Sequence, residues 1–194
     1  MDVRPVRADD VAPLAATLAR AFDDDPVTRW VYANGARRPH WAERFFRWQL
    51  HRLAPQDVSW TTDDHRGGAL WALPGRWRED TGDTFALFRA TLLGVLPRLP
   101  RVLRSLGQVE QRHPKGRHLY LAVLGVDPAH QGEGVGSALI RPGLELCDRE
   151  GLPAYLETGK ERNLAFYGRH GFRVTGELTL PKGPPVWFLW RPAS

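Results

Sequence analysis

The feature that most constrains this chain is a succession of an apolar run, a glycine-rich segment and a helical pattern. The apolar run is Leu119–Val126, the glycine-rich segment is Gln131–Ser137, and the helical pattern continues through Leu139, Leu144 and Cys147. Glycines lack a Cβ, so a backbone rich in them can turn tightly and approach a ligand. The unpaired N–H groups of the first helical turn then point at that ligand, where the helix dipole favours negative charge. The succession therefore predicts a site for a phosphate-bearing cofactor.

The patterns on either side predict one α/β domain over residues 1–194, built on a mixed sheet. Strands are expected at 2–7, 58–62, 68–73, 119–126, 154–158, 172–180 and 186–190, with 58–73 forming a hairpin. Helices are expected at about 9–22, 26–32, 39–53, 82–112 (with breaks near Pro97 and Pro100), 135–150 and 163–170, the last ended by Gly171. Because residues 119–126 are nearly all apolar, we expect a central strand buried on both faces.

Composition narrows the classes of partner. Hydrophobic residues make up 42% of the chain, charged residues 25%, and the net charge is +5. A basic surplus can indicate a nucleic-acid binder, but these arginines are scattered among acidic residues, which favours an ordinary mixed surface. No apolar run reaches the roughly 20 residues of a membrane-spanning helix. We therefore expect neither a nucleic acid nor a membrane as partner, and the sole cysteine, with no apolar N-terminal signal region, favours the cytoplasm.

Two phosphate-bearing cofactors compete for the glycine-rich segment. A dinucleotide site would need G-x-G-x-x-G directly after a strand, with an acidic residue about 20 residues further on. Glu157 has a suitable place for that acid, but the glycines here read G-x-G-x-G and Asp127–His130 separate them from the strand. The segment also lies too late in the chain for two mononucleotide-binding halves, so a dinucleotide-binding oxidoreductase is the weaker interpretation.

The second cofactor is a CoA thioester. Gln131, Gly134 and Gly136 fit the Gln-x-x-Gly-x-Gly loop of the CoA-dependent N-acetyltransferase (GNAT) superfamily, and Asn163–Tyr167 with Gly171 resembles its later Asn…Tyr…Gly-Phe segment in compact form. Further segments between residues 3 and 192 are similar to the puromycin N-acetyltransferases, least of all between about 35 and 115. The resemblance implies a GNAT fold, with a mixed, mostly antiparallel sheet of about six or seven strands, helices on both faces, and acetyl-CoA as cofactor.

The resemblance also places that cofactor on particular residues. The strand end, formed by Leu124, Gly125 and Val126, would pair with the pantetheine arm and help to polarise the thioester oxygen. Asn163 would hydrogen-bond the same arm. The pyrophosphate would lie on Gln131, Gly132, Glu133, Gly134, Val135, Gly136 and Ser137. Because Glu133 adds negative charge beside phosphates, we expect its side chain to point to solvent.

Acetyl transfer to an amine also needs a proton donor for the departing thiolate and a neutral attacking amine. Tyr167 shares a helical face with Asn163 and is the candidate donor; the alternative is a packed aromatic ring beside Phe166. Glu157 ends an apolar strand, where a buried carboxylate requires a reason. It is the candidate base, acting directly or through a water, and the alternative is a structural hydrogen bond to backbone. No residue cluster has metal-ligand spacing, so no metal is expected.

These patterns together predict an acetyl-CoA-dependent N-acetyltransferase that acts on a primary amine of a small molecule by direct attack on the thioester. The alternative from another class is a module of the same shape that binds acyl-CoA without catalysis. The resemblance suggests an aminoacyl or antibiotic-like acceptor, while protein N-termini and polyamines stay open, and it allows a homodimer. His130 and His170 are weaker catalytic candidates, and His113 and His118 are expected in a loop.

Overall fold

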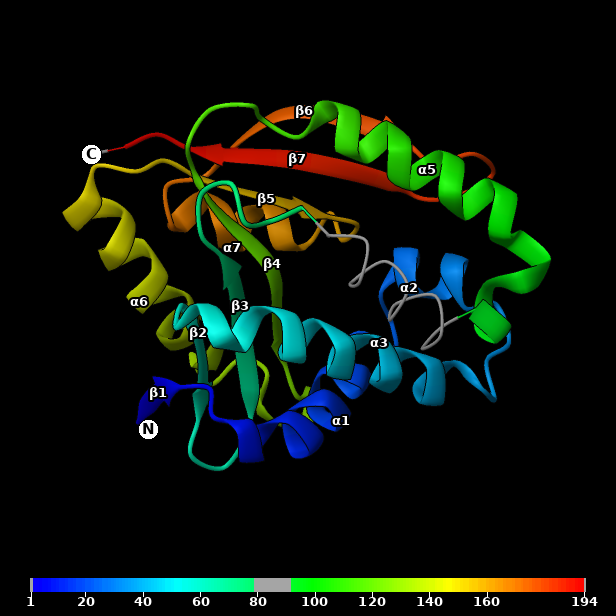
Figure 1. Cartoon of the computed structure of the whole chain (residues 1–194), viewed down its shortest axis with the longest axis horizontal. Helices are drawn as coiled ribbons and strands as arrows, with labels where there is room; N and C mark the ends of the chain where they lie inside the picture. Colours follow the sequence, from blue (N-terminus) through cyan, green and yellow to red (C-terminus); the bar gives the residue numbers. More distant parts are fainter. Residues whose placement is uncertain (1, 79–91, 194) are drawn as a thin grey trace.

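The centre of the molecule is a seven-stranded sheet, seen in a computed structural model that describes residues 2–78 and 92–193 (Figure 1). The strands are β1 (Val3–Pro5), β2 (Ser59–Thr62), β3 (Gly67–Ala72), β4 (Leu119–Val126), β5 (Ala154–Thr158), β6 (Arg173–Thr179) and β7 (Pro185–Arg191). Their order across the sheet is β1-β2-β3-β4-β5-β7-β6. Only β4 and β5 run parallel, and the other neighbours are antiparallel. The expected mixed, mostly antiparallel sheet is therefore confirmed.

Helices cover both faces of this sheet. They are α1 (Val11–Ala21), α2 (Pro26–Val31), α3 (Arg38–Leu53), α5 (Leu99–Arg112), α6 (Val135–Glu150) and α7 (Asn163–Arg169). Four single turns accompany them: η1 (Ala8–Asp10), η2 (Ala54–Gln56), η3 (Leu96–Arg98) and η4 (Pro128–His130). Side chains of α1 and α3 form one core with the sheet, and side chains of α6 form a second core on its other face.

The expected helix boundaries agree with these elements. The expected break near Pro97 and Pro100 is present, because η3 ends at Arg98 and α5 begins at Leu99. Pro100 lies in the first turn of α5, where the N–H groups are unpaired in any case. Gly171 has a φ of 85°, the left-handed conformation expected of a residue that ends a helix. The expected helical segment at 82–91 lies outside the described residues. Within the described part of the chain, no helix is long and apolar enough to cross a membrane.

The central strand β4 departs from the expected burial on both faces. Its residues alternate between buried and half-buried, and the half-buried ones are Tyr120, Ala122, Leu124 and Val126. The pairing with β3 runs from Leu124 to Val123 and then skips Ala122 before resuming at Leu121, so Ala122 forms a bulge. Because of the bulge, alternate side chains of β4 point to one face of the sheet before Ala122 and to the other face after it. Sequence pattern alone predicted a uniformly buried strand because every residue in it is apolar or glycine, apart from Tyr120.

The sheet opens between β4 and β5. The two strands pair only at Leu119 with Ala154 and at Tyr120 with Tyr155, and beyond these pairs they diverge. The remainder of β4, Leu121–Val126, pairs with β3 on its other side. Its edge toward β5 is therefore unpaired, and backbone groups there remain available to another extended molecule.

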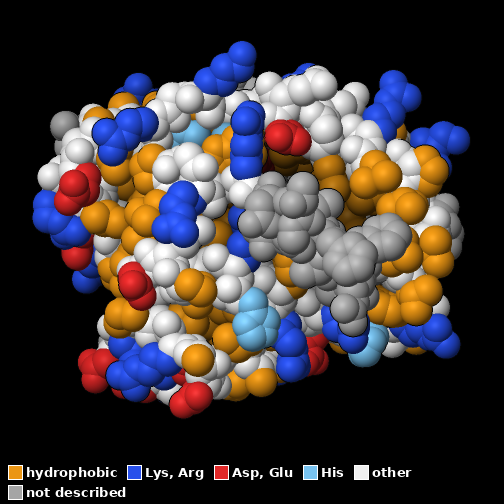
Figure 2. Space-filling model, viewed as in Figure 1, with side chains coloured by type: hydrophobic (Ala, Val, Ile, Leu, Met, Phe, Trp, Pro, Cys, Tyr) orange, Lys and Arg blue, Asp and Glu red, His pale blue; other side chains and the backbone are white. Residues whose placement is uncertain are grey.

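Charged side chains of both signs are interspersed on the surface. Figure 2 shows Lys and Arg side chains spread over the visible face, with acidic side chains among them. Several arginines are paired with carboxylates: Arg4 Nη1 lies 2.7 Å from Asp10 Oδ2, and Arg20 Nη2 lies 2.6 Å from Asp127 Oδ2. This arrangement is the mixed surface that the scattered arginines favour.

Candidate active site

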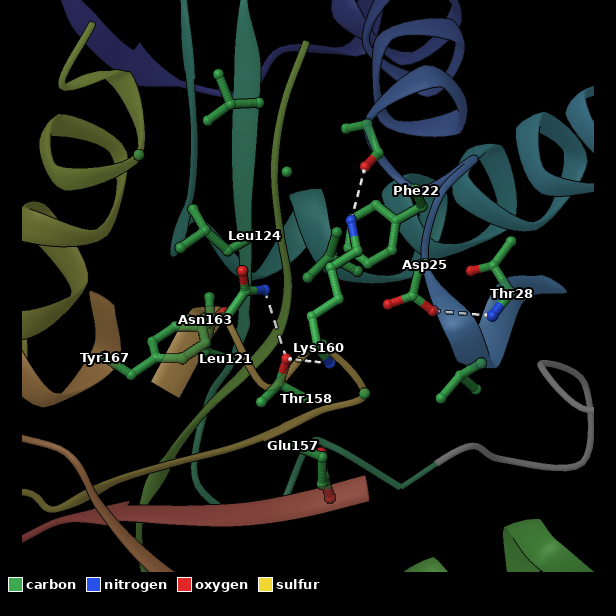
Figure 3. A pocket seen from close by; sticks show the side chains of 18 of the residues that line it. Phe22, Asp25, Thr28, Leu121, Leu124, Glu157, Thr158, Lys160, Asn163 and Tyr167 are labelled. Atoms are coloured by element: carbon green, nitrogen blue, oxygen red, sulfur yellow. Dashed lines mark hydrogen bonds between the residues drawn. The ribbon is translucent and has the colours of Figure 1, made fainter. Parts of the chain in front are cut away.

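A cavity of about 670 Å³ lies where β4 and β5 diverge (Figure 3). Cavities of this size typically bind cofactors and small ligands. It is lined by every residue predicted for the site except Glu133: Leu124, Gly125, Val126, Gln131, Gly132, Gly134, Val135, Gly136, Ser137, Glu157, Asn163 and Tyr167. The fold thus brings together three segments that lie apart in the sequence.

Two of the loop glycines are required by the backbone. Gly132 has a φ of 85° and Gly134 a φ of 81°, and Gly134 is the N-cap of α6. Residues with a Cβ rarely adopt this left-handed conformation. Gly136 differs, because an added Cβ there would lie 3.5 Å from the Phe166 ring, an ordinary contact. The protein alone therefore does not require glycine at 136, whereas a ligand pressed against the backbone would.

The loop presents free hydrogen-bond donors. Within the described parts of the chain, the backbone N–H groups of residues 131–137 make no hydrogen bond of good geometry to another residue. The side chain of Gln131 donates from Nε2 to the carbonyl oxygen of Val126 at 3.1 Å, which ties the loop to the end of β4. The helix dipole of α6 adds positive potential at these donors. The loop can therefore bind an anion such as a pyrophosphate.

Glu133 points away from the cavity, as expected. Its side chain is 49% exposed, and its Oε2 lies 3.4 Å from Arg66 Nη1 and 3.4 Å from His130 Nδ1. The Arg66 guanidinium thus offsets its charge beside the anion-binding loop.

Gly125 allows helix α1 to pack closely against β4. A Cβ at this position would lie 2.8 Å from Leu18 Cδ2 and 2.9 Å from Phe22 Cε2, both too close. The close approach puts Ala21 and Phe22 on the wall of the cavity. The glycine next to the strand end thereby shapes the space beside the predicted thioester.

Asn163 and Tyr167 lie on one side of the cavity (Figure 3). Asn163 Nδ2 donates to Thr158 Oγ1 at 3.5 Å, so the start of α7 is joined to the end of β5. Tyr167 is 6% exposed, and its hydroxyl makes no hydrogen bond to any other described residue. Burial, and then the nearby charge of Asp25, raise the pKa of Tyr167 well above its usual value of 10. The phenol is therefore protonated near neutral pH and can donate its proton into the cavity.

Asp25 places a second carboxylate on the opposite wall (Figure 3). It is 6% exposed and accepts a hydrogen bond from the Thr28 backbone N–H at 2.8 Å, which caps α2. Burial raises the pKa of Asp25, although the Thr28 hydrogen bonds and the charge of Lys160 oppose the shift. The sequence indicates a helix start at Pro26, but a short-range pattern gives no sign that Asp25 lines the cavity.

Glu157 lies at the end of β5, where its side chain is 13% exposed. Its Oε1 is 3.6 Å from His113 Nδ1. Burial first, and then the Glu157 charge, raise the pKa values of Tyr120 and Tyr155, so both phenols are protonated near the carboxylate. The Tyr155 hydroxyl nevertheless completes no hydrogen bond of good geometry in the described structure. Among the described residues, no backbone N–H donates to the Glu157 side chain.

His113 and His118 lie in the connection between α5 and β4, as expected, but both are buried, with exposures of 7% and 2%. Their proximity to Glu157 was not predicted. The two histidines flank residues 114–117 directly before an apolar strand, and this local pattern gives no sign of a contact with Glu157.

The chain is similar to known acetyltransferases. The acetyltransferase (GNAT) family is matched over residues 40–172. An uncharacterised N-acetyltransferase from Schizosaccharomyces pombe is 28% identical over 186 residues, covering 89% of this chain and 74% of that protein. Two crystal structures share the fold. Histone acetyltransferase HPA2 and related acetyltransferase from Corynebacterium glutamicum has a TM-score of 0.67 and 24% identity, covering 99% of this chain and 96% of that chain. Arylalkylamine N-acetyltransferase 2 from Aedes aegypti has a TM-score of 0.64 and 13% identity, covering 100% and 99%.

Proposed function

Because this chain belongs to the acetyltransferase (GNAT) family, we propose that it transfers the acetyl group of acetyl-CoA to a primary amine of a small molecule. The chain is an N-acetyltransferase of a family that uses acyl-CoA, generally acetyl-CoA. One observation carries the proposal. The free N–H groups of residues 131–137 open onto the same cavity as the buried phenol of Tyr167 and the carboxylate of Glu157.

The cofactor would lie along the gap in the sheet. Its pyrophosphate would accept hydrogen bonds from the loop at 131–137, in the field of the α6 dipole. The pantetheine arm would pair with the unpaired edge of β4 between Leu121 and Val126, much as an added strand does. Acetyl-CoA supplies the activated acetyl group, and the protein supplies its orientation and a cavity that excludes water.

The chemistry then requires two proton transfers. As the amine nitrogen attacks the thioester carbon, it loses a proton to Glu157, directly or through a water. As the carbon–sulfur bond breaks, the thiolate takes a proton from the Tyr167 hydroxyl. The raised pKa of Tyr167 keeps that proton in place until the thiolate forms, and exclusion of water also raises the proton affinity of the thiolate.

The walls of the cavity favour an amine acceptor with an apolar part. Glu157 and Asp25 supply carboxylates that can accept hydrogen bonds from an amine, while Phe22, Phe45 and Trp30 supply aromatic surface. An aminoacyl or aromatic amine of the puromycin type has this combination, and the resemblance of segments outside residues 35–115 points the same way.

Thiol release from acetyl-CoA, measured over a panel of amines, tests the proposal. The panel contains puromycin, simple arylalkylamines, polyamines and a peptide with a free N-terminus. We expect thiol release with the aminoacyl or aromatic amines, together with the acetylated amine in the mass spectrum. If CoA binds but no amine in the panel gives thiol release, a module that binds acyl-CoA without catalysis becomes the better account.

A further inference from the structure

A buried pair of histidines lies next to Glu157. The Nε2 atoms of His113 and His118 are 2.9 Å apart, and His118 Nδ1 is 2.7 Å from the carbonyl oxygen of Gly116. His113 Nδ1 faces Glu157 Oε1 at 3.6 Å. Glu157, His113, His118 and the Gly116 carbonyl thus form a continuous chain of polar groups.

The hydrogen bonds determine where the protons of this chain lie. A carbonyl oxygen only accepts, so His118 Nδ1 carries a proton and donates it to Gly116. Burial lowers the pKa of His118, so its ring is neutral and its Nε2 has a lone pair. His113 Nε2 must then donate to His118. A neutral His113 therefore presents a lone pair from Nδ1 to the Glu157 carboxylate.

A lone pair and a carboxylate facing each other repel, and one added proton converts the repulsion into a hydrogen bond. The two atoms are 3.6 Å apart, slightly farther than a hydrogen bond. Proton uptake would close this gap, with the proton on Glu157 or on His113. The Glu157–His113 pair is thereby built to receive one proton.

The surroundings hold the His113 ring in its orientation. The Trp77 ring stacks on it, with ring centroids 3.5 Å apart and an interplanar angle of 21°. The Tyr120 and Tyr155 rings contact it edge-on, with ring centroids 4.9 and 4.7 Å from that of His113. A stacked indole also stabilises an imidazolium. The other titratable or charged groups near the pair are His118, the two phenols and Arg52, whose charge acts on Tyr120.

We propose that His113 is a positioning residue that receives, through Glu157, the proton released by the acceptor amine, and that His118 fixes the tautomer of His113. The proposal rests on the proposed function. The amine nitrogen forms a bond to the acetyl carbon and loses a proton to Glu157, which shares it with His113 Nδ1. The carbon–sulfur bond breaks, and the thiolate takes the Tyr167 proton. Solvent restores that proton and removes the shared one when the products leave, so the charges balance.

The kinetic test compares His113→Gln with Glu157→Gln and the double variant. Glutamine can keep the donor to His118 while it removes Nδ1. We expect His113→Gln to lower kcat by at least about 10-fold, as for a weakened general base. It should also shift the acidic limb of the kcat/KM–pH profile and leave the KM for acetyl-CoA unchanged.

The double variant should be no slower than Glu157→Gln alone, since His113 acts through that carboxylate. His51→Gln, on an exposed part of α3, is the matched control with unchanged kinetics. Independent losses in the double variant would overturn the proposal.

A second readout does not depend on turnover, so it separates this proposal from the proposed function. Nitrogen-15 NMR of labelled histidines follows protonation of His113 Nδ1 in the free protein. We expect the pH at which this nitrogen takes up a proton to fall in Glu157→Gln, and His118 Nε2 to remain unprotonated in the wild type near neutral pH. An unchanged His113 titration in Glu157→Gln, or a protonated His118 Nε2, would show that the pair shares no proton.

Discussion

Tyr167 carries the clearest kinetic prediction. Replacing it by phenylalanine removes one oxygen that has no hydrogen-bond partner in the described structure and leaves the ring packed against Phe166 and Phe172. If the phenol protonates the thiolate, Tyr167→Phe should lower kcat by roughly 10²- to 10⁴-fold. The affinity for acetyl-CoA should be unchanged, because the phenol acts on the leaving group. Steady-state kinetics and calorimetry on the same sample measure the two quantities, and unchanged turnover would remove Tyr167 from the mechanism.

The two loop glycines lack a side chain for different reasons: the backbone conformation requires glycine at 134, and the predicted ligand requires it at 136. Gly134→Ala forces a Cβ onto a φ of 81° and should lower the free energy of unfolding by about 1–2 kcal/mol. Gly136→Ala meets only an ordinary contact and should leave stability unchanged or slightly raised. Its effect should appear in CoA binding, which a methyl group under the pyrophosphate would weaken. Urea unfolding and calorimetry of both variants measure these effects; equal losses of stability would contradict the distinction.

Local motifs made part of the site predictable. Gln131, Gly134, Gly136, Asn163 and Tyr167 occupy positions at fixed spacing within single strand–helix units, so the sequence alone predicted one site for them, and all five line the cavity. The contributions of Asp25, His113 and His118 depend on burial and on neighbours far away in the chain. No short-range pattern encodes such contacts, which is why the sequence did not reveal them.

Helix α6 and strand β3 depend on a glycine at their contact. A Cβ on Gly143 would lie 2.4 Å from Cε2 of Trp71, whose ring is fully buried and has no room to move. Gly143→Ala should therefore lower the free energy of unfolding by about 1–3 kcal/mol. Gly107→Ala is the matched control in α5, where nothing lies within 4 Å of the added methyl, and it should raise stability by up to about 1 kcal/mol. Chemical denaturation measures both, and a stable Gly143→Ala would show that this contact is looser than described.

The order and type of the elements followed from the sequence, but their register did not. Alternating and helical periodicities predicted all seven strands and the helices at 11–21, 38–53 and 135–150. No sequence pattern predicts the bulge at Ala122 or the divergence of β4 from β5, because an apolar strand pairs equally well in several registers. These two irregularities create the cavity, so its shape could be known only from the structure.

The N-terminal edge of the molecule should show an acid-dependent stability. Asp10 accepts hydrogen bonds from Arg4 at 2.7 and 2.8 Å and contacts His65 Nε2 at 2.7 Å, which joins β1 and η1 to the β2–β3 turn. The Arg4 guanidinium holds the pKa of Asp10 well below its usual value. A lowered folded-state pKa stabilises the protein above the unfolded value of about 3.9, and this contribution is lost as the pH falls toward the folded-state value.

Asp10→Asn should therefore reduce stability at pH 7 and flatten the loss of stability below about pH 4. Thermal unfolding of the two proteins between neutral and acidic pH measures the difference. Asp63→Asn is a suitable comparison, because that carboxylate contacts the same arginine but is 66% exposed. Parallel stability curves for Asp10→Asn and the wild type would contradict the assignment.

As a whole, the molecule is a sheet that is split between β4 and β5, and this gap is called the seam. The anion-binding loop lies at one end of the seam, and two buried carboxylates lie beside it. Both faces of the sheet are covered by helices, so the seam is where a long ligand can enter the sheet (Figure 1). The central claim is that this seam holds acetyl-CoA. Calorimetric titration of the folded protein with acetyl-CoA tests it most directly. We predict saturable binding of one molecule per chain, weakened in Gly136→Ala. A folded protein that gives no binding heat at any accessible acetyl-CoA concentration and shows no thermal stabilisation by it would contradict the account.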